Sequence, residues 1–180
     1  MSLGQVRGPS PVKLFFAMLY PSREVFDWSI RQIARYVGEI DLLSEEWPFT
    51  WTDYYASIGA HLLRRFASTR GLVSPEGLFR LKHLSNFLEE ISGGGEGRRV
   101  NLDPGYLDAA RVVLFTTKDS AHRVYVGEGI YAEVTLRYRR GRWTFHDYTY
   151  PDYRDARYLA FFDELRRSYL GEIKKGGFRP

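Results

Sequence analysis

Cysteine is absent from the 180-residue sequence. Disulfide bonds, thiolate catalysis and metal sites with cysteine ligands are therefore excluded. Long hydrophobic runs are also missing, because no stretch approaches the roughly 20 apolar residues that a membrane-spanning helix requires. The N-terminal residues lack the pattern of a signal peptide. From these absences we expect a cytoplasmic protein that has no membrane partner.

Lysine is scarce, so the basic charge of the chain comes mainly from arginine. Five lysines leave 21 arginines among the 26 basic residues, with a net charge of +4 and a pI near 9.3. Arginine forms bidentate hydrogen bonds with phosphate and carboxylate groups and stacks on aromatic rings, and 16% of the residues are aromatic. The composition therefore permits a phosphorylated or nucleic-acid partner. A GC-rich genome or a heat-adapted surface would give the same composition.

The chain length and the 44% hydrophobic content suit one globular domain with a substantial core. We expect residues 1–11 to form a disordered tail, residues 12–174 to form a single α+β domain, and residues 175–180 to be a frayed C-terminus.

The first hundred residues predict six elements in the order strand, helix, strand, strand, helix, strand. They are a strand at 12–20, a helix at 23–37 that Gly38 ends, a strand from Glu39, a strand at 61–69, a helix that begins at Ser74-Pro75-Glu76, and a strand at 98–102. The aromatic segment 47–55 is predicted to be a loop. This order is that of a ferredoxin-like split βαβ core, βαββαβ, over residues 12–102.

Residues 103–174 are predicted to extend this core with a helix, an antiparallel three-stranded hairpin unit and a C-terminal helix. Asp103-Pro104 has the form of a helix cap followed by a first-position proline, and predicts a helix from Gly105 to about Thr117. A strand over 111–116 is the alternative. Asp155 is predicted to cap the last helix, whose buried stripe contains Leu159, Phe162, Leu165, Tyr169 and Ile173.

Strict alternation of apolar and polar residues from Ile130 to Tyr138 predicts a half-buried strand. A three-residue loop at 127–129 places Val126 opposite Ile130, and Arg140-Gly141 forms a two-residue turn into the next strand. Counting along these hairpins assigns the side chains to two faces. The apolar face contains Val124, Val126, Ile130, Ala132, Val134, Leu136, Tyr138, Trp143 and Phe145, and the polar face contains Arg123, Tyr125, Tyr131, Glu133, Thr135, Arg137, His146 and Tyr148.

A polar cluster near the first hairpin is the candidate functional site, because the register places Arg123 beside Glu133 and Glu133 beside Tyr148. The candidate ligand-binding residues, suited to a phosphorylated small molecule or nucleotide, are Arg98, Arg99, Lys118, His122, Arg123, Tyr131 and Tyr148. The candidate catalytic groups are Asp103, Asp119, His122 and Glu133, of which Glu133 or Asp119 is the base.

Asp103, Asp119 and Glu133 are also candidate metal ligands, because hard cations prefer carboxylate oxygens. A helix cap at Asp103 and an ion pair between Arg123 and Glu133 are the structural alternatives. The sequence identifies neither a cofactor nor an oligomeric state.

Several catalytic motifs are missing. A P-loop requires GxxxxGK followed by Ser or Thr, and the glycine-rich segment 92–97 lacks the lysine and the hydroxyl residue. Thr117-Lys118-Asp119 lacks the residue that separates Lys from Asp in the guanine-reading motif of GTPases. His83-Leu84-Ser85 is a single match to a two-histidine phosphoesterase motif that must occur twice, and no G-x-S-x-G elbow is present. The sequence argues against a conventional GTPase.

Segments along nearly the whole chain, from about Pro11 to Tyr169, resemble the uncharacterised prokaryotic family catalogued as domain of unknown function 4416. The matching segments are Pro11 to Phe15 with Tyr20-Pro21, Thr52 to Tyr55, RRVNLDPGYL, TTKD, HRVYVGEGIYAEVTLRYR and Tyr150 to Arg154. The resemblance implies no established activity, although members are often labelled GTP-binding proteins in genome annotation.

Three functions remain open from the sequence. The first is a site for a phosphorylated small molecule or nucleotide at the polar cluster. The second is RNA binding by arginine and tyrosine on an exposed sheet face, which supplies phosphate contacts and stacking. The third is a non-catalytic assembly protein. A deep pocket favours the first function, a flat positive sheet the second, and a large apolar surface the third.

Overall fold

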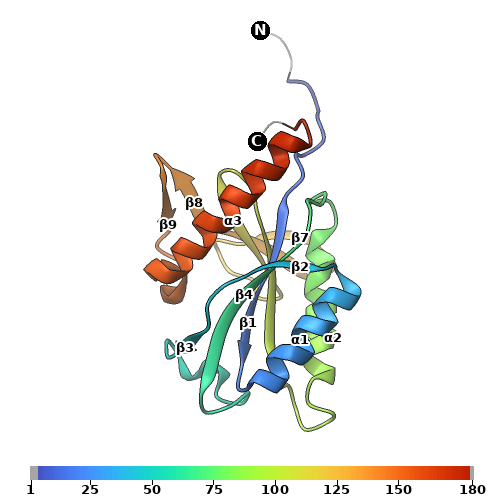
Figure 1. Ribbon diagram of the computed structural model, residues 1–180, viewed down its shortest axis with the longest axis vertical. Coiled ribbons are helices and arrows are strands. Elements are labelled where there is room, and N and C mark those ends of the chain that lie inside the picture. The colour runs from blue at the N-terminus through green and yellow to red at the C-terminus, as the bar shows by residue number, and fades with distance from the viewer. Residues whose placement is uncertain (1–3, 179–180) are drawn as a thin grey trace.

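The computed structural model describes residues 4–178, which fold into an antiparallel sheet with helices on both faces (Figure 1). The helices are α1 (Arg23–Tyr36), α2 (Leu81–Ile91) and α3 (Ala156–Lys175), with short 3-10 turns η1 (Asp53–Tyr55), η2 (Leu78–Arg80) and η3 (Pro151–Arg154). The strands are β1 (Lys13–Tyr20), β2 (Ile40–Leu43), β3 (Trp47–Phe49), β4 (Leu62–Thr69), β5 (Asn101–Leu107), β6 (Arg111–Thr116), β7 (Val124–Gly127), β8 (Ile130–Arg139) and β9 (Arg142–Phe145). The predicted α+β class is confirmed.

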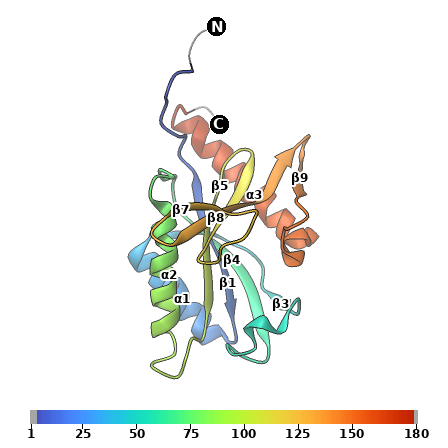
Figure 2. The same ribbon diagram turned by 180° about the vertical axis from the view of Figure 1, so that it is seen from behind.

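The strand order is β2-β4-β1-β5-β6-β8-β7, with β3 paired to β4 and β9 paired to β8. In the first half, β1 lies between β4 and β5, and β2 lies outside β4, which is the order expected of the predicted split βαβ core. Figure 2 shows β7 and β8 running across the direction of β1 and β4. The sheet therefore turns strongly between its two halves.

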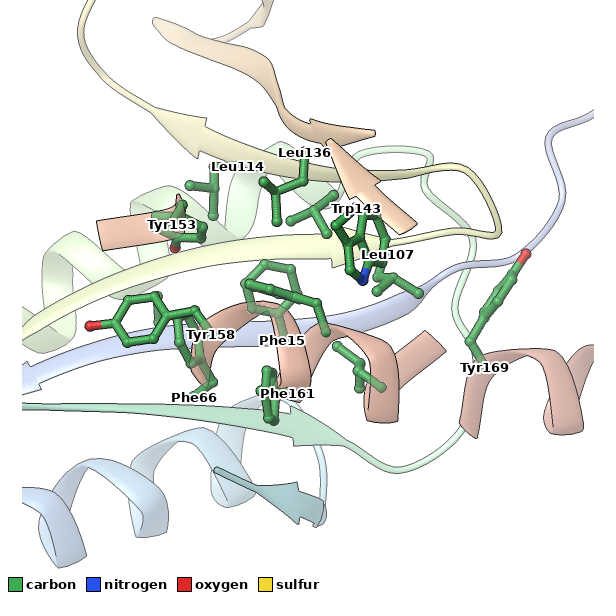
Figure 3. Packing of buried hydrophobic residues seen from close by; sticks show 14 of the residues in the cluster. Phe15, Phe66, Leu107, Leu114, Leu136, Trp143, Tyr153, Tyr158, Phe161 and Tyr169 are labelled. Carbon is green, nitrogen blue, oxygen red and sulfur yellow. The ribbon is translucent and has the colours of Figure 1, made fainter. Parts of the chain in front are cut away.

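Two hydrophobic cores cover the two faces of the sheet. Helices α1 and α2 pack on one face over side chains such as Phe16 and Leu102. Helix α3 packs on the other face, where the ring of Phe66 contacts several aromatic rings (Figure 3). Fully burying one such side chain contributes about 1.5–3 kcal/mol. The predicted α3 stripe is confirmed at Phe162, Leu165, Tyr169 and Ile173, which are buried, whereas Leu159 is partly buried.

The buried ammonium group of Lys13 joins the beginning of the chain to its last helix. Its Nζ donates to Asp41 at 2.5 Å and to Glu172 of α3 at 2.6 Å, and the Lys13 side chain is fully buried. An uncompensated buried charge is costly, and the two carboxylates compensate the buried charge of Lys13. The start of β1 and the end of α3 consequently lie at the same end of the molecule (Figure 1).

The two ends of the described chain lie outside the helices and strands. Residues 4–10 are exposed and contain no regular structure, and Gly176 and Gly177 form a hydrogen-bonded turn after α3. The remaining residues of the predicted tail and C-terminal end, 1–3 and 179–180, lie outside the described residues. Within residues 4–178, no helix is both long enough and apolar enough to cross a membrane.

Two local predictions in the first half are wrong in part. The predicted loop at 47–55 contains β3, in which Trp47 and Phe49 are buried and pair with β4. Ser74 Oγ accepts a hydrogen bond from Glu76 N–H, but Gly77 then adopts a φ of 72°, so the α-helix begins only at Leu81. A left-handed glycine interrupts a helix.

The predicted helix from Gly105 to Thr117 is wrong, because β5 and β6 occupy this segment and the strand alternative over 111–116 is correct. Asp103 and Pro104 lie inside β5, opposite β1. The dipeptide that resembles a helix start is therefore a strand segment.

Strands β5 and β6 separate at Pro104, which creates a fork in the sheet. β5 pairs with β1 along its whole length but pairs with β6 only over Gly105–Leu107. The N–H and C=O groups of Leu102 point away from β1, where α2 side chains bind them. Alternate residues of a strand direct their backbone groups to the same side, so the nitrogen of Pro104 also faces β6. Proline has no N–H group, and the ladder ends there.

The hairpin predictions are confirmed in one turn and corrected in the other. Arg140 and Gly141 both have positive φ and form the predicted two-residue turn, with Arg137 opposite Thr144. At the other hairpin Gly127, rather than Val126, lies opposite Ile130, and the turn contains two residues. A bulge between Tyr125 and Gly127 causes the difference.

A second bulge divides the predicted polar face. Val112 and Leu114 of β6 both face the α3 core and lie opposite Leu136 and Glu133 of β8, so the pairing passes over Thr135 as an extra residue. The extra residue moves Glu133 to the same side as Leu136, and turns Arg137 to the opposite side. The prediction that Glu133 and Arg137 share one face is wrong.

Gly105 is expected to be required at the fork. A Cβ atom there would lie 2.5 Å from the carbonyl oxygen of Val113 and 2.8 Å from Cζ of Phe15. We predict that Gly105→Ala lowers the free energy of unfolding by about 1–3 kcal/mol, measured by urea denaturation. The control is Gly171→Ala in α3, where the added Cβ meets open space and helix propensity favours alanine by about 1 kcal/mol. A Gly105→Ala protein as stable as the parent would contradict the close packing.

Candidate functional site

A cavity of about 530 Å³ opens where β5 and β6 separate. Its walls come from both halves of the sheet and from the segments before β4 and before α3. The lining residues are Phe49, Trp51, Thr52, Tyr54, Tyr55, Arg64, Lys82, Asn86, Arg98, Asn101, Asp103, Leu114, Phe115, Thr116, Thr117, Lys118, Arg123, Glu133, Tyr150, Pro151, Asp152 and Tyr153. Five of them are cationic and three are carboxylates, and aromatic rings form much of the remaining wall.

At the fork, two side chains of α2 form the hydrogen bonds with β5 that β6 does not form. The carboxylate of Glu89 accepts a hydrogen bond from Leu102 N–H at 2.8 Å, and Lys82 Nζ donates to Leu102 C=O at 3.2 Å. Both side chains are more than nine-tenths buried. The backbone groups of β5 are therefore satisfied without a neighbouring strand.

Lys82 and Glu89 belong to an ionic network that reaches the cavity. Lys82 Nζ also donates to Asp103 at 3.0 Å, while Arg98 donates to Glu89 at 2.7 Å and Asn101 donates to Asp103 at 2.7 Å. Burial raises the pKa of Glu89. Burial would also raise the pKa of Asp103, but Lys82, Arg64 and Asn101 together hold it below its ordinary value. Asp103 is therefore a carboxylate at neutral pH.

Arg64 is a buried cation on the β4 side of the cavity. Its Nη2 donates to Asp152 at 3.1 Å, and its guanidinium carbon lies 5.0 Å from the ring centre of Phe49. Burial lowers the pKa of Arg64 and the Asp152 carboxylate raises it, and the net change is an increase. Within the described structure, the Nε and Nη1 atoms of Arg64 are buried and have no hydrogen-bond acceptor, and the buried hydroxyl of Tyr158 has no hydrogen-bond partner. Such groups are uncommon in protein interiors.

Arg123 and Glu133 form the wall on the β8 side, and the predicted pairing of these two residues is confirmed. Arg123 Nε donates to Glu133 at 2.8 Å, and its other nitrogens donate to Lys118 C=O and to Tyr150 Oη. His122 Nε2 lies 3.3 Å from the Glu133 carboxylate. The ring of Tyr148 stacks on His122, with centres 4.2 Å apart. This stack lies behind Glu133, outside the cavity lining.

Lys118 and Tyr54 meet at the cavity and connect two loops that are distant in sequence. Lys118 Nζ donates to Tyr54 Oη at 2.7 Å and lies 4.1 Å from the centre of its ring. The hydrogen bond from Lys118 lowers the pKa of the Tyr54 hydroxyl. Both side chains are exposed, and among the described residues Lys118 has no carboxylate partner. Lys118 is therefore the cavity cation most available to a ligand.

The structure brings five of the predicted site residues together and separates the others. Arg98, Asp103, Lys118, Arg123 and Glu133 line the cavity. The remaining predicted residues do not line it: Arg99 and Asp119 are exposed, His122 and Tyr148 stack behind Glu133, and Tyr131 packs on Tyr125.

The candidate metal ligands do not converge. Lys82 and Asn101 bind Asp103, Arg123 binds Glu133, and Asp119 is exposed. Across residues 4–178, no group of three or more histidine, aspartate or glutamate side chains is placed to hold a metal ion.

Sequence reasoning missed four charged residues of this site, Arg64, Lys82, Glu89 and Asp152. One signal was present: Lys82, Ser85 and Glu89 recur at helical spacing next to the apolar stripe of α2, and all three are buried. A charged pair on the buried side of a helix indicates a partner across the interface. Arg64 and Asp152 are 88 residues apart, and no local pattern connects them.

Removing Lys82 tests the ionic support of the fork. We predict that Lys82→Met lowers the free energy of unfolding by about 3–5 kcal/mol, because Asp103 and Glu89 lose their buried counter-charge. Chemical denaturation at pH 7 measures the change. Arg23→Ala is the matched control, since Arg23 pairs with Asp27 on the exposed surface of α1 and contributes about 0–1 kcal/mol.

The effect of Lys82→Met is expected to depend on pH. Because the pKa of Asp103 is lowered in the folded protein, its stabilising contribution is present above the unfolded-state pKa of about 3.9 and is lost as the pH falls through the folded value. The variant lacks the part of this contribution that Lys82 supplies. The stability difference from the parent should therefore narrow as the pH falls below about 4. A constant difference would show that Lys82 acts only through packing.

Comparisons with curated proteins and with solved structures gave no match. A family comparison did match, and it covers β1 through most of α3, including every residue that lines the cavity. On this match over residues 10–169, the chain belongs to the family described as Domain of unknown function (DUF4416).

Proposed function

We propose that the cavity binds a phosphorylated small molecule, and that a nucleotide is the class of ligand that best suits it. The observation that carries the proposal is a cavity of about 530 Å³ whose walls combine an excess of cations with aromatic rings. Small-ligand sites usually have volumes of about 300–1,000 Å³. A nucleotide requires both a cationic surface for phosphate and a flat apolar surface for the base.

Lys118 supports the phosphate end of the proposal. Among residues 4–178 its ammonium group binds only the Tyr54 hydroxyl, so a phosphate group can accept its hydrogen bond without breaking an ion pair. Thr116 and Thr117 line the same part of the cavity and add hydroxyl donors. Hydrogen bonds to charged groups contribute about 1.5–3 kcal/mol. In this arrangement side chains bind the phosphate, in place of the backbone amides of a P-loop.

Aromatic side chains of the segment from β3 to η1 support the base end. Trp51 and Tyr54 remain 44% and 60% exposed beside the cavity, whereas Phe49 and Tyr55 pack against each other deeper inside. Burial raises the pKa of Tyr55, which therefore keeps its proton at neutral pH and serves as a hydrogen-bond donor. Stacking of one base on an aromatic side chain contributes about 1–3 kcal/mol.

A binding panel tests the proposal. Nucleoside mono-, di- and triphosphates, the corresponding nucleosides and inorganic pyrophosphate are titrated by calorimetry and by thermal unfolding. We expect a nucleotide to bind more tightly than either its nucleoside or pyrophosphate, because only the complete ligand uses both walls. At a hundred times its dissociation constant it should add about 2.7 kcal/mol to stability.

Lys118→Ala is the sharpest variant for this site. It removes a cation that has no carboxylate partner within residues 4–178, so we expect unchanged stability and a nucleotide affinity reduced by about tenfold or more, which equals about 1.4 kcal/mol. Lys174→Ala, at the C-terminal end of α3 and away from the cavity lining, removes the same charge as a control. The proposal fails if no ligand of the panel raises the unfolding temperature, or if both variants bind as the parent does.

A further inference from the structure

The bulge at Thr135 creates a second cationic surface on the face of β8 that turns away from α3. There Arg137 lies directly opposite Arg111 of β6, and Arg139 follows two residues later on the same face. These three arginines line a hollow of about 280 Å³ with Ala110, Val134 and Tyr138. None of these residues lines the larger cavity. The hollow is a separate site.

The arginines of this surface are poorly neutralised. Arg111 pairs with Asp108 at 2.9 Å. Over the described part of the chain, the side chains of Arg137 and Arg139 have neither a hydrogen-bond acceptor nor an ion-pair partner, and Nε of Arg137 is buried without an acceptor. An arginine that is partly buried and unpaired at the wall of a hollow has hydrogen-bonding capacity for a ligand.

The arrangement also places like charges directly opposite one another. Arg111 lies opposite Arg137, and Arg139 lies opposite Arg142 on the other side of β8. Arg140 occupies the turn between β8 and β9 with a φ of 50°. Like charges at directly opposed positions of a sheet repel each other, so the folded chain is not stabilised by this choice of residues. A bound polyanion would neutralise the repulsion.

We propose that this surface, which comprises Arg111, Arg137, Arg139, Arg140 and Arg142, binds the phosphate backbone of a nucleic-acid strand. Residues two apart on a strand are about 7 Å from each other, and neighbouring strands are about 5 Å apart, so several guanidinium groups converge on one hollow. Arginine binds phosphate oxygens through two parallel hydrogen bonds. The arginine side chains extend from the hollow to the hairpin turn at Arg140, a longer surface than one phosphate group covers. A strand with several phosphates therefore fits this surface better than a ligand with one.

The test is fluorescence anisotropy with a labelled 12-nucleotide oligouridine RNA at several salt concentrations. The double variant R137Q/R139Q should bind about tenfold more weakly and show a salt slope smaller by about 1.4, since each phosphate contact of a single strand contributes about 0.7. The matched control is R31Q/R35Q, which removes two exposed arginines of α1 and the same net charge. The control should bind RNA nearly as the parent does.

A stability measurement separates binding from a structural role. R137Q/R139Q should unfold at the same temperature as the parent or at a higher one, because the substitutions remove repulsion. RNA affinity of Lys118→Ala should equal that of the parent, because the hollow is separate from the cavity. The proposal would be overturned if the two double variants lost RNA affinity equally or if the parent did not bind RNA. It would also be overturned if Lys118→Ala lost its RNA affinity. Arginine-dependent binding to phosphatidylserine vesicles without binding to RNA would overturn it too.

Discussion

The ion pair of Lys82 and Glu89 on α2 is the interaction on which the cavity depends. A sheet that separates in its middle exposes backbone N–H and C=O groups of an inner strand, and each buried group left unpaired costs about 1–3 kcal/mol. Glu89 and Lys82 bind both groups of Leu102. Strands β5 and β6 therefore diverge without this penalty, and side chains from both halves of the sheet enter the space between them.

Local patterns in the sequence were sufficient to predict most of the fold. Alternation and helical spacing predicted the βαββαβ order and the α3 stripe, because burial of one face determines both. Asp103-Pro104 misled the prediction, since the same dipeptide suits a helix start and a strand that lacks a partner on one side. The choice depends on Glu89, which lies 13 residues before Leu102 and binds it through a side chain. Likewise, nothing in the alternation around Thr135 distinguishes a regular strand from one with a bulge.

The residues of the candidate site also divide into those that local patterns predicted and those that they did not predict. Arg123 and Glu133 belong to one hairpin, so counting residues from the turn was enough to place them together. Arg64 and Lys82 reach the cavity from β4 and α2, and their positions depend on the order of strands in the sheet. Sequence reasoning thus predicted the cavity wall that a single hairpin forms. It missed the walls that only the complete tertiary structure brings together.

The buried Lys13 has a consequence for how the chain matures during synthesis. Proteins are made from the N-terminus at about 5–20 residues per second, so β1 leaves the ribosome well before α3. One carboxylate partner of Lys13, Asp41, lies 28 residues later in the chain, but the other, Glu172 of α3, lies 159 residues later. Until α3 docks, the buried ammonium group of Lys13 in β1 has only one of the two carboxylate partners that it has in the folded protein. The N-terminal half therefore reaches its final packing only after α3 has been synthesised and has docked.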